Sequence, residues 1–384
     1  MKQTKELPSV EQAYENRSAR AAELKKQGEK LIGYFCTHVP VEMLTAAGLV
    51  PFRITGDAAE PISKADTNLE TIMCSFIRSA FDLALKGRYN FLDGMVGVHT
   101  CDATFRIYDI WRYYIKTSYN HFVNLPHMVD PTSFEFFEAE LETFKRSLEK
   151  FTGIELSNQR LNSAIKAHNE NRALIRELYE LSKQDPPLIS GVEVKKVEVM
   201  AMSLPVAEAS QLVREVIKEA KERSNGVPKH PARLLVYGDA IDGPSLIEII
   251  EESGANVVVD ASCVGTRHYW YDVEVSDNPL AALARRYLGD IPCPRTFRPR
   301  KPASHKEDID NRFGFLRDLA RDFGANGAVV YVIRFCDTHE LDVPDVLEYL
   351  EANGLPALHI EDEYTMASPA RLKTRVQAFL EMIS

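Results

Sequence analysis

The order of apolar and polar residues predicts short buried strands that alternate with helices in both the first and the last third of the chain. The apolar runs predict strands at residues 31–35, 50–54, 91–98, 121–125, 234–237, 256–259, 328–333 and 357–360. Helical spacing predicts helices at 41–47, 74–85, 102–114, 244–252, 279–287, 309–323, 343–352 and 369–382. Short apolar strands that alternate with helices are typical of a parallel sheet.

The middle of the chain has a different pattern. Helical spacing continues over residues 133–183 and again over 204–223, and the segment 226–231 is a linker by its glycine and proline content. We therefore expect an α/β protein with two Rossmann-like or flavodoxin-like parallel-sheet domains joined by a helical segment. We expect an N-terminal α/β domain with a helical leader at residues 1–132, a helical segment at 133–230 and a C-terminal α/β domain at 231–384.

The two α/β parts also echo one another in sequence. Val39-Pro40 leads through a predicted helix to Gly48, and Val343-Pro344 leads in the same way to Gly354. Each Val-Pro pair follows a predicted strand that ends near a cysteine. This echo is weak evidence for an internal repeat, and it agrees with two similar domains.

Composition and charge exclude several classes of function. The chain of 384 residues is 45% hydrophobic and 27% charged, with a net charge of −10, which indicates a folded, soluble protein. An acidic chain argues against nucleic acid as the main partner. No charge-free apolar stretch reaches the roughly 18 residues of a membrane span, and no signal peptide is evident, so we expect a cytoplasmic location without membrane contact. The motifs CxxC, GxGxxG, GxxxxGK[ST], HExxH and GxSxG are missing, so any chemistry must come from residues far apart in sequence.

The positions of the cysteines carry more information than their number. Four of them follow the C-terminal ends of predicted strands: Cys36, Cys101, Cys263 and Cys336. Cys74 opens a predicted helix, and Cys293 lies in an Ile-Pro-Cys-Pro turn. Ligands of open α/β sheets bind at the carboxyl ends of the strands, where helix N-termini stabilise a thiolate. A single cysteine is most often a small buried hydrophobe, but the joint pattern favours metal binding. Thiolates with few histidines favour an iron–sulfur cluster over zinc.

Other polar residues near the strand ends are weaker candidates. His38, His99 and His339 each lie within three residues of such a cysteine and are candidates for proton transfer, although a histidine that is simply packed or solvated is the commoner case. Glu42 is expected in the first turn of a helix, where it would interact with the helix dipole. The run Arg267-His268-Tyr269-Trp270 could contact a nucleotide-like group or pack at a domain edge.

Several segments together resemble the iron–sulfur subunits of (R)-2-hydroxyacyl-CoA dehydratases and of ATP-dependent benzoyl-CoA reductases. The resembling segments are residues 33–51 (GYFCTHVPVEMLTAAGLVP), 73–78 (MCSFIR), 92–94 (LDG), 100–102 (TCD), 334–337 (RFCD) and 354–356 (GLP). Their order and spacing agree over nearly the whole chain, and together they are specific at the level of the family.

The resemblance implies a mechanism and a set of ligands. Members of the family hold a [4Fe–4S] cluster on three cysteines, whose matching positions here are Cys74, Cys101 and Cys336, and leave one iron open for the thioester carbonyl of an acyl-CoA substrate or for water. An ATP-dependent iron–sulfur activator protein supplies one low-potential electron, which makes a ketyl radical. The absence of a P-loop in this chain agrees with ATP being used on a separate protein.

Cys36, Cys263 and Cys293 leave an alternative open. A branch of the family carries a double-cubane [8Fe–9S] cluster on six cysteines, and its homodimeric members reduce small molecules; all six positions have counterparts here. The chain could therefore form a homodimer, or a heterodimer with a homologous subunit. A further alternative, from another class, is a non-catalytic scaffold or a zinc-binding α/β subunit.

Overall fold

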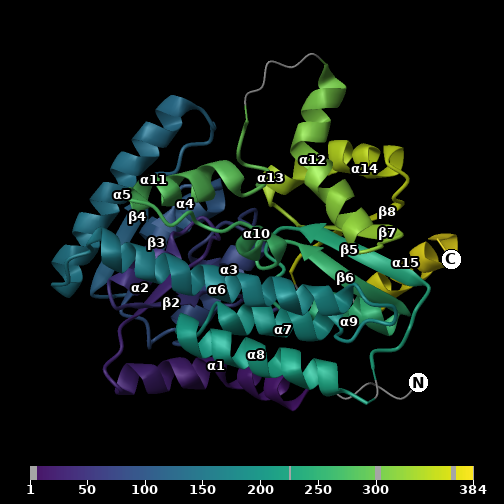
Figure 1. The fold of residues 1–384 in the computed structure, drawn as a ribbon, viewed down its shortest axis with the longest axis horizontal. Helices are drawn as coiled ribbons and strands as arrows, with labels where there is room; N and C mark the ends of the chain where they lie inside the picture. Colours follow the sequence, from purple (N-terminus) through teal and green to yellow (C-terminus); the bar gives the residue numbers. More distant parts are fainter. Residues whose placement is uncertain (1–6, 225, 299–303, 365–368, 384) are drawn as a thin grey trace.

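A computed structural model describes residues 7–224, 226–298, 304–364 and 369–383 of the chain (Figure 1). It contains two four-stranded sheets in which all strand pairs are parallel. The first sheet has the order β2-β1-β3-β4, with β1 (Leu31–Tyr34), β2 (Val50–Arg53), β3 (Gly94–Val98) and β4 (Tyr119–Val123). The second has the order β6-β5-β7-β8, with β5 (Ala232–Gly238), β6 (Ala255–Ala261), β7 (Gly327–Ile333) and β8 (Ala357–Asp362). The expected α/β class is confirmed.

Helices connect the strands and cover the sheets. Around the first sheet lie α1 (Pro8–Lys26), α2 (Val41–Ala46), the 3₁₀ turn η1 (Ala65–Thr67), α3 (Ser75–Leu85) and α4 (Asp102–Tyr114). The middle of the chain forms α5 (Pro131–Thr152), α6 (Asn158–Ser182), α7 (Gly191–Ala201) and α8 (Val206–Glu222). The last part forms α9 (Ser245–Glu252), α10 (Thr266–Tyr269), α11 (Pro279–Ala284), the π-helical turn η2 (Arg285–Asp290), α12 (His305–Asp322), α13 (Asp337–Glu340), α14 (Val343–Ala352) and α15 (Pro369–Ile383).

The two sheets have the same topology. In each, the first strand in sequence lies between the second and the third, so the strand order reverses between β1 and β3 and again between β5 and β7. Ligands of open parallel sheets bind outside the carboxyl ends of the strands at such a switch point. The similarity predicted for the two α/β parts is therefore present in their topology. The sequence echo is not its cause, because α2 joins the first and second strands of its sheet whereas α14 joins the third and fourth.

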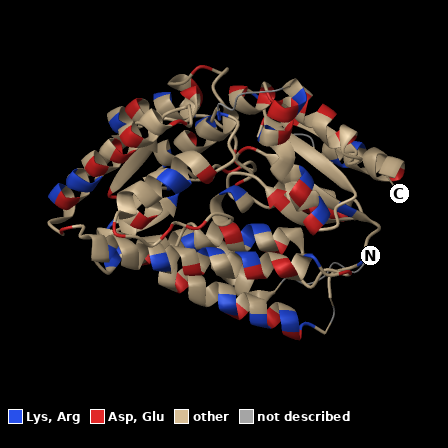
Figure 2. Cartoon of the chain, turned by 45° about the horizontal axis from the view of Figure 1, so that its top comes forward, with Lys and Arg blue, Asp and Glu red and all other residues tan. Residues whose placement is uncertain are grey.

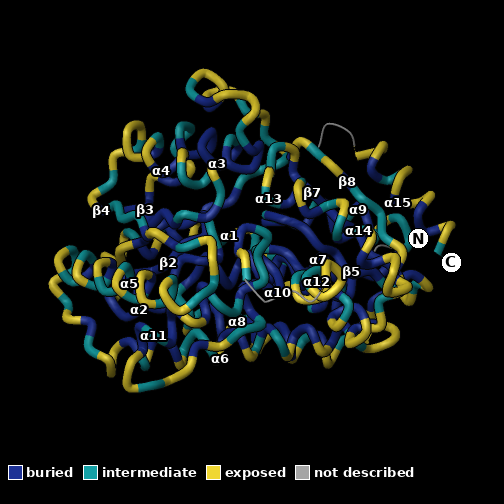
Figure 3. The backbone as a smooth tube through the Cα atoms, turned by 90° about the horizontal axis from the view of Figure 1, so that it is seen from above, coloured by how far each residue is buried: buried dark blue, intermediate teal, exposed yellow. Residues whose placement is uncertain are grey.

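Burial explains why the strands appear in the sequence as continuous apolar runs. Every residue of β1, β2, β3, β6 and β7 is buried, because helices cover both faces of each sheet. Figure 3 shows the buried strands inside a layer of helices with exposed outer faces. The acidic and basic residues occur mainly on the helices, and the strands contain few of them (Figure 2). No helix in the described part of the chain is long and apolar enough to cross a membrane.

The middle helices connect the two halves. Helix α6 contacts α2 near the first sheet and β6 of the second, and α8 packs along α6 (Figure 1). Helix α7 was not among the elements expected from the sequence. Every residue of α7 is buried, so the helix lacks the polar face that reveals an amphipathic helix. The proposed boundaries at 132 and 230 remain predictions.

Candidate functional site

The six cysteines lie where the chain leaves the strands or enters helices. Cys36 and Cys263 come two residues after the ends of β1 and β6, and the backbone positions that cap the N-termini of helices are occupied by Cys74 (α3), Cys101 (α4) and Cys336 (α13). Cys293 lies in the turn that follows η2. Because β1 and β3 flank one switch point and β5 and β7 the other, Cys36, Cys101 and Cys336 stand at the places where these sheets bind ligands.

Cys74, Cys101 and Cys336 form a first group of thiols. Burial raises the pKa of Cys74, and the nearby charges of Asp239 and Cys101 raise it further. Burial likewise raises the pKa of Cys336, with additional contributions from Asp239, Cys74 and Cys101. Three thiols from three separate elements therefore lie close enough to interact electrostatically; Cys74 is buried, and Cys101 and Cys336 are partly buried.

Cys36, Cys263 and Cys293 form a second group beside the first. Burial raises the pKa of Cys293 to about 12, and Cys263 and Cys36 contribute in the same direction. Burial raises the pKa of Cys263, Arg267 opposes this, and Cys36 adds to it. The pKa of Cys101 is raised first by burial and also by Cys263, so the two groups are neighbours.

Cationic side chains line the second group. The Nη1 of Arg267 donates to Cys263 Sγ at 3.4 Å and lies 3.2 Å from His339 Nε2, and its guanidinium is 5.0 Å from the ring centre of Tyr237. Its Nε and Nη2 are buried without a hydrogen-bond partner among the described residues. Arg295 interacts electrostatically with Cys293, and its guanidinium is held by backbone oxygens, including that of Thr100 at 3.0 Å. Positive charge next to thiols favours the thiolate form.

The three candidate histidines have different surroundings. His38 is fully buried, with Nδ1 at 3.5 Å from Cys36 Sγ, and burial holds its pKa well below the usual value. His339 is buried beside Arg267; because a guanidinium only donates, Nε2 is the acceptor and the proton sits on Nδ1. His99 is half-buried, and its ring lies 5.0 Å from that of His127; it forms no hydrogen bond with a cysteine among the described residues. The structure thus brings two of the three histidines to the cysteine groups.

Two functional neighbours were not found in the sequence. Asp239 directly follows β5; its Oδ2 accepts a hydrogen bond from the Ile333 amide at 2.9 Å, and its charge raises the pKa of Cys336. Arg295 follows Cys293 by two positions, which was the only local signal for it. The 267–270 run is largely packed, because α10 is buried and Arg267 donates to Cys263; contact with a nucleotide-like group stays a prediction.

The thiols do not converge on one point. Within the described residues, no group of three or more His, Cys, Asp or Glu side chains could hold a metal ion. A structural zinc site would bring its ligands around a single ion. A cubane cluster is larger and takes each cysteine at a different corner. The described residues therefore do not form a preformed single-ion site around these thiols.

Comparison with known proteins identifies the family. The family model described as "2-hydroxyglutaryl-CoA dehydratase, D-component" matches residues 36–383. The chain belongs to this family. The resemblance seen in the sequence is therefore confirmed, and so is the expected enzyme class of dehydratases and related oxidoreductases.

Three curated relatives match nearly end to end. The putative dehydratase subunit YjiM of Escherichia coli (strain K12) is 27% identical, over 94% of this chain and 93% of its own length. The (R)-phenyllactyl-CoA dehydratase beta subunit of Clostridium sporogenes is 25% identical, over 94% and 93%. A benzoyl-CoA reductase subunit of Thauera aromatica is 26% identical, over 97% and 96%. Each of these relatives is named as a subunit.

Proposed function

We propose that this chain is the iron–sulfur subunit of an enzyme that acts like an (R)-2-hydroxyacyl-CoA dehydratase or a benzoyl-CoA reductase. Cys74, Cys101 and Cys336 would hold a [4Fe–4S] cluster. The observation that supports this most is the electrostatic interaction among these three thiols, because each comes from a different element and only the fold brings them together. Bound there, the cluster would supply one-electron chemistry at low potential and an open iron for the thioester of an acyl-CoA substrate.

The protein's own residues would control charge and protons around this site. Arg267 and Arg295 would offset the negative charge of the thiolates. His339 would hold a proton at Nδ1, while His38 would stay neutral in its buried position beside Cys36. His99 is the most exposed of the three, so it is the best placed to exchange protons with solvent.

The proposal includes partners. The chain has no P-loop, so an ATP-dependent iron–sulfur activator protein would deliver the electron. Since the relatives are named as subunits, the working enzyme would contain either two copies of this chain or this chain with a homologous second subunit.

Iron analysis of Cys101→Ser tests the ligand assignment. Serine is a harder and more basic ligand than cysteine, so the anaerobically purified variant should lose iron and activity together. Asp102→Asn is the matched control, because Asp102 is the exposed next residue. The wild-type chain should carry about four irons. Full iron content and an unchanged EPR spectrum in Cys101→Ser would refute the assignment, and zinc or no metal in the wild type would favour a scaffold or zinc-binding subunit.

The second thiol group supports a second candidate function. Cys36, Cys263 and Cys293 interact with one another, and Cys263 meets a buried guanidinium that has no carboxylate partner among the described residues. These features favour a double-cubane [8Fe–9S] cluster on all six cysteines, in a reductase of small molecules.

Cys263→Ala separates the two candidates. With a double cubane, the wild type should carry about eight irons, and the variant should lose iron and change its low-potential EPR signal. With a single cubane, the variant should keep about four irons and lose only about 1 kcal/mol of packing energy.

A further inference from the structure

A cluster of charged side chains lies buried between α7 and the end of β6. Lys195 pairs with Glu198, three positions further along α7, at 2.7 Å, and it also pairs with Asp260 of β6. The hydroxyl of Tyr179 donates to Glu198 Oε1 at 2.6 Å, and all four residues are buried. Taking charges out of water is costly, so a buried ion pair adds little net stability, but it can fix one geometry. The geometry that this cluster fixes is that of the turn after β6.

Asp260 begins the turn that carries Cys263. Its Oδ1 accepts a hydrogen bond from the Ser262 amide at 2.7 Å. The Ser262 hydroxyl in turn accepts from the amides of Val264 at 3.3 Å and Gly265 at 3.2 Å. The residues on both sides of Cys263 are therefore held by hydrogen bonds that start at the Asp260 carboxylate.

Helix α7 also holds the far end of this segment. The Tyr269 hydroxyl, at the end of α10, donates to the Glu198 carbonyl at 2.9 Å, so the segment from Asp260 to Tyr269 is tied to α7 at both ends. Arg267 lies inside the segment, and its Nη1 donates to Cys263 Sγ at 3.4 Å. Because both partners belong to the same short segment, their contact depends on the shape that α7 imposes on it.

The turn packs against β6 so closely that only glycine fits at residue 265. A Cβ atom at Gly265 would lie 2.3 Å from the Asp260 carbonyl oxygen and 2.9 Å from its carboxylate carbon. Contacts this short with the backbone force the chain to move, since protein interiors are close-packed. The turn therefore cannot adapt freely to another arrangement of Asp260.

Lys195 holds the Asp260 carboxylate in place. Asp260 presents Oδ2 to Lys195 and Oδ1 to the Ser262 amide, so one carboxylate joins the helix to the turn. Burial raises the pKa of Glu198 to about 8, with Lys195 opposing the shift and Asp260 adding to it. At pH 7 most Glu198 side chains are then protonated, which leaves Asp260 as the counter-ion of Lys195.

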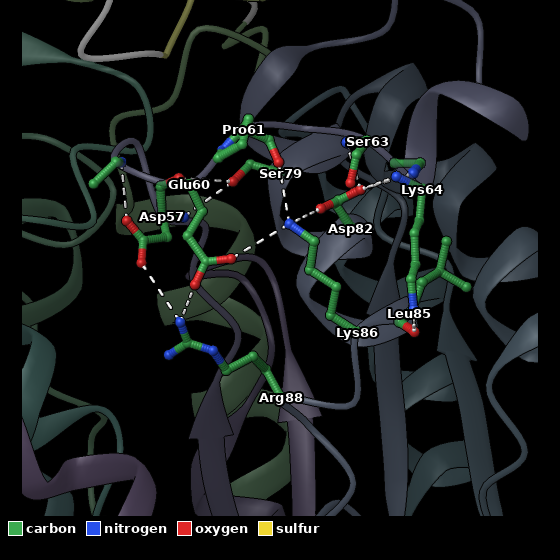
Figure 4. Close-up of polar contacts among 12 residues, drawn as sticks. Asp57, Glu60, Pro61, Ser63, Lys64, Ser79, Asp82, Leu85, Lys86 and Arg88 are labelled. Atoms are coloured by element: carbon green, nitrogen blue, oxygen red, sulfur yellow. Dashed lines mark hydrogen bonds and ion pairs between the residues drawn. The ribbon is translucent and has the colours of Figure 1, made fainter.

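The chain uses the same arrangement a second time, in the loop after β2 (Figure 4). The buried carboxylate of Asp82 pairs through Oδ2 with Lys86 at 2.7 Å, and its Oδ1 accepts from the amides of Ser63 and Ala65, both at 2.9 Å. There too, one buried carboxylate joins a lysine to the backbone of a loop. Residues 63–65 contain no cysteine, so this second arrangement provides a matched control.

We propose that Asp260, held by Lys195, is a positioning residue that sets Cys263 against Arg267. Its effect is transmitted through the Ser262 amide. The inference deepens the six-cysteine candidate function and rests on it for its meaning at the cluster, where Cys263 would be a ligand. The contacts that carry the positioning are all between residues of this chain, so the positioning itself can be tested in metal-free protein.

Alkylation of the metal-free protein with iodoacetamide, read for each cysteine by mass spectrometry, tests the positioning. Asp260→Leu leaves the buried Ser262 amide without its acceptor, so the turn should open more often and Cys263 should react at least about tenfold faster than in the wild type. Asp260→Asn keeps an oxygen acceptor and should restore a rate close to that of the wild type. In both variants Glu198 becomes the counter-ion of Lys195, because one of the groups that raise its pKa is gone, so they differ mainly in the hydrogen bond to Ser262.

Three controls separate a local effect from loss of the fold. Cys74 lies in the other half of the chain, and its alkylation rate should stay unchanged in Asp260→Leu. Asp82→Leu breaks the equivalent contact in the other loop and should leave the rate of Cys263 unchanged. Gly265→Ala moves the turn without altering the charged cluster and should also accelerate Cys263, so it carries the test if Asp260→Leu does not fold.

The outcomes distinguish this proposal from the six-cysteine function. Equal Cys263 rates in the wild type and Asp260→Leu, equal rates in the two Asp260 variants, or an equal acceleration of Cys74 would overturn the positioning; so would an unchanged Cys263 rate in Gly265→Ala. In protein that carries about eight irons, Asp260→Leu should change the EPR signal and Asp260→Asn should not, and an unchanged signal in Asp260→Leu would refute the role at the cluster. About four irons in the wild type would refute the six-cysteine cluster, while fast alkylation of Cys263 in Asp260→Leu would still support the positioning.

Discussion

Replacing the buried Arg267 with methionine should have opposite consequences for the iron-loaded and the metal-free protein. In the loaded protein, if Cys263 is a ligand, its sulfur is a thiolate at 3.4 Å from Arg267 Nη1. At an effective dielectric constant of about 20, the attraction between these charges is about 5 kcal/mol. That attraction is lost in Arg267→Met, so the variant should hold its iron far less tightly.

In the metal-free protein the same substitution should cost little. Burial raises the pKa of Cys263, so its thiol is neutral there at pH 7, and Arg267 is then a buried cation without a carboxylate partner among the described residues. Its removal forfeits two hydrogen bonds to a charged group, at about 1.5–3 kcal/mol each, but also relieves several kcal/mol of uncompensated charge burial. These effects offset each other, and we expect a net change within about 2 kcal/mol.

Two measurements on the same variant check this difference. Iron retention is followed anaerobically against increasing concentrations of a chelator, and thermal unfolding is followed for the metal-free chain. Arg267→Met should release iron at chelator concentrations at least about tenfold lower than the wild type, with a nearly unchanged melting temperature of the metal-free form. Arg176→Met is the control, because Arg176 pairs with Asp272 near the surface. Unchanged iron retention, or equal destabilisation of both forms, would show that Cys263 is not ionised and refute the reasoning.

The remaining predictions concern stability and the use of ATP. Glu42→Gln should destabilise the fold by about 3–5 kcal/mol in urea unfolding, because it breaks a fully buried ion pair with Arg172. Burial disfavours the charged form of Glu42, but Arg172 outweighs this and lowers the folded-state pKa of Glu42. The stabilisation from the ion pair is therefore complete at neutral pH and is lost as the pH falls below the unfolded-state pKa of about 4.3. A difference in stability between wild type and variant that did not depend on pH would contradict this prediction. The exposed pair of Arg20 and Glu23 provides the control Glu23→Gln, which should change little. The purified chain alone should not hydrolyse ATP, so robust phosphate release without any partner protein would contradict the proposed activator.

Much of the fold could be predicted from local patterns. Apolar runs identified all eight strands of the described residues, since strands buried on both faces by helices contain few polar residues. Amphipathic helices were found because their apolar positions recur every three to four residues. The pattern missed α7, whose polar side chains are buried along with its apolar ones; Lys195, for example, lies inside and pairs with Glu198 at 2.7 Å. A period of three to four residues between apolar positions appears only in a helix that has one face in solvent and one face buried.

The placement of the cysteines at strand ends and helix starts could also be predicted from the sequence, because the apolar pattern locates the ends of strands and the beginnings of helices. Their division into the same two groups was expected from the family resemblance and not from the local pattern, since the electrostatic interactions join segments as distant as Cys74 and Cys336. The local pattern also did not reveal the partner of Glu42, which sits in a first helical turn as expected but is paired with Arg172, 130 positions away. The local sequence determines which residues end strands and begin helices. The packing of the two sheets and of the helices between them decides which of those ends meet, because charge interactions and hydrogen bonds act over a few ångströms in space, whatever the separation in sequence.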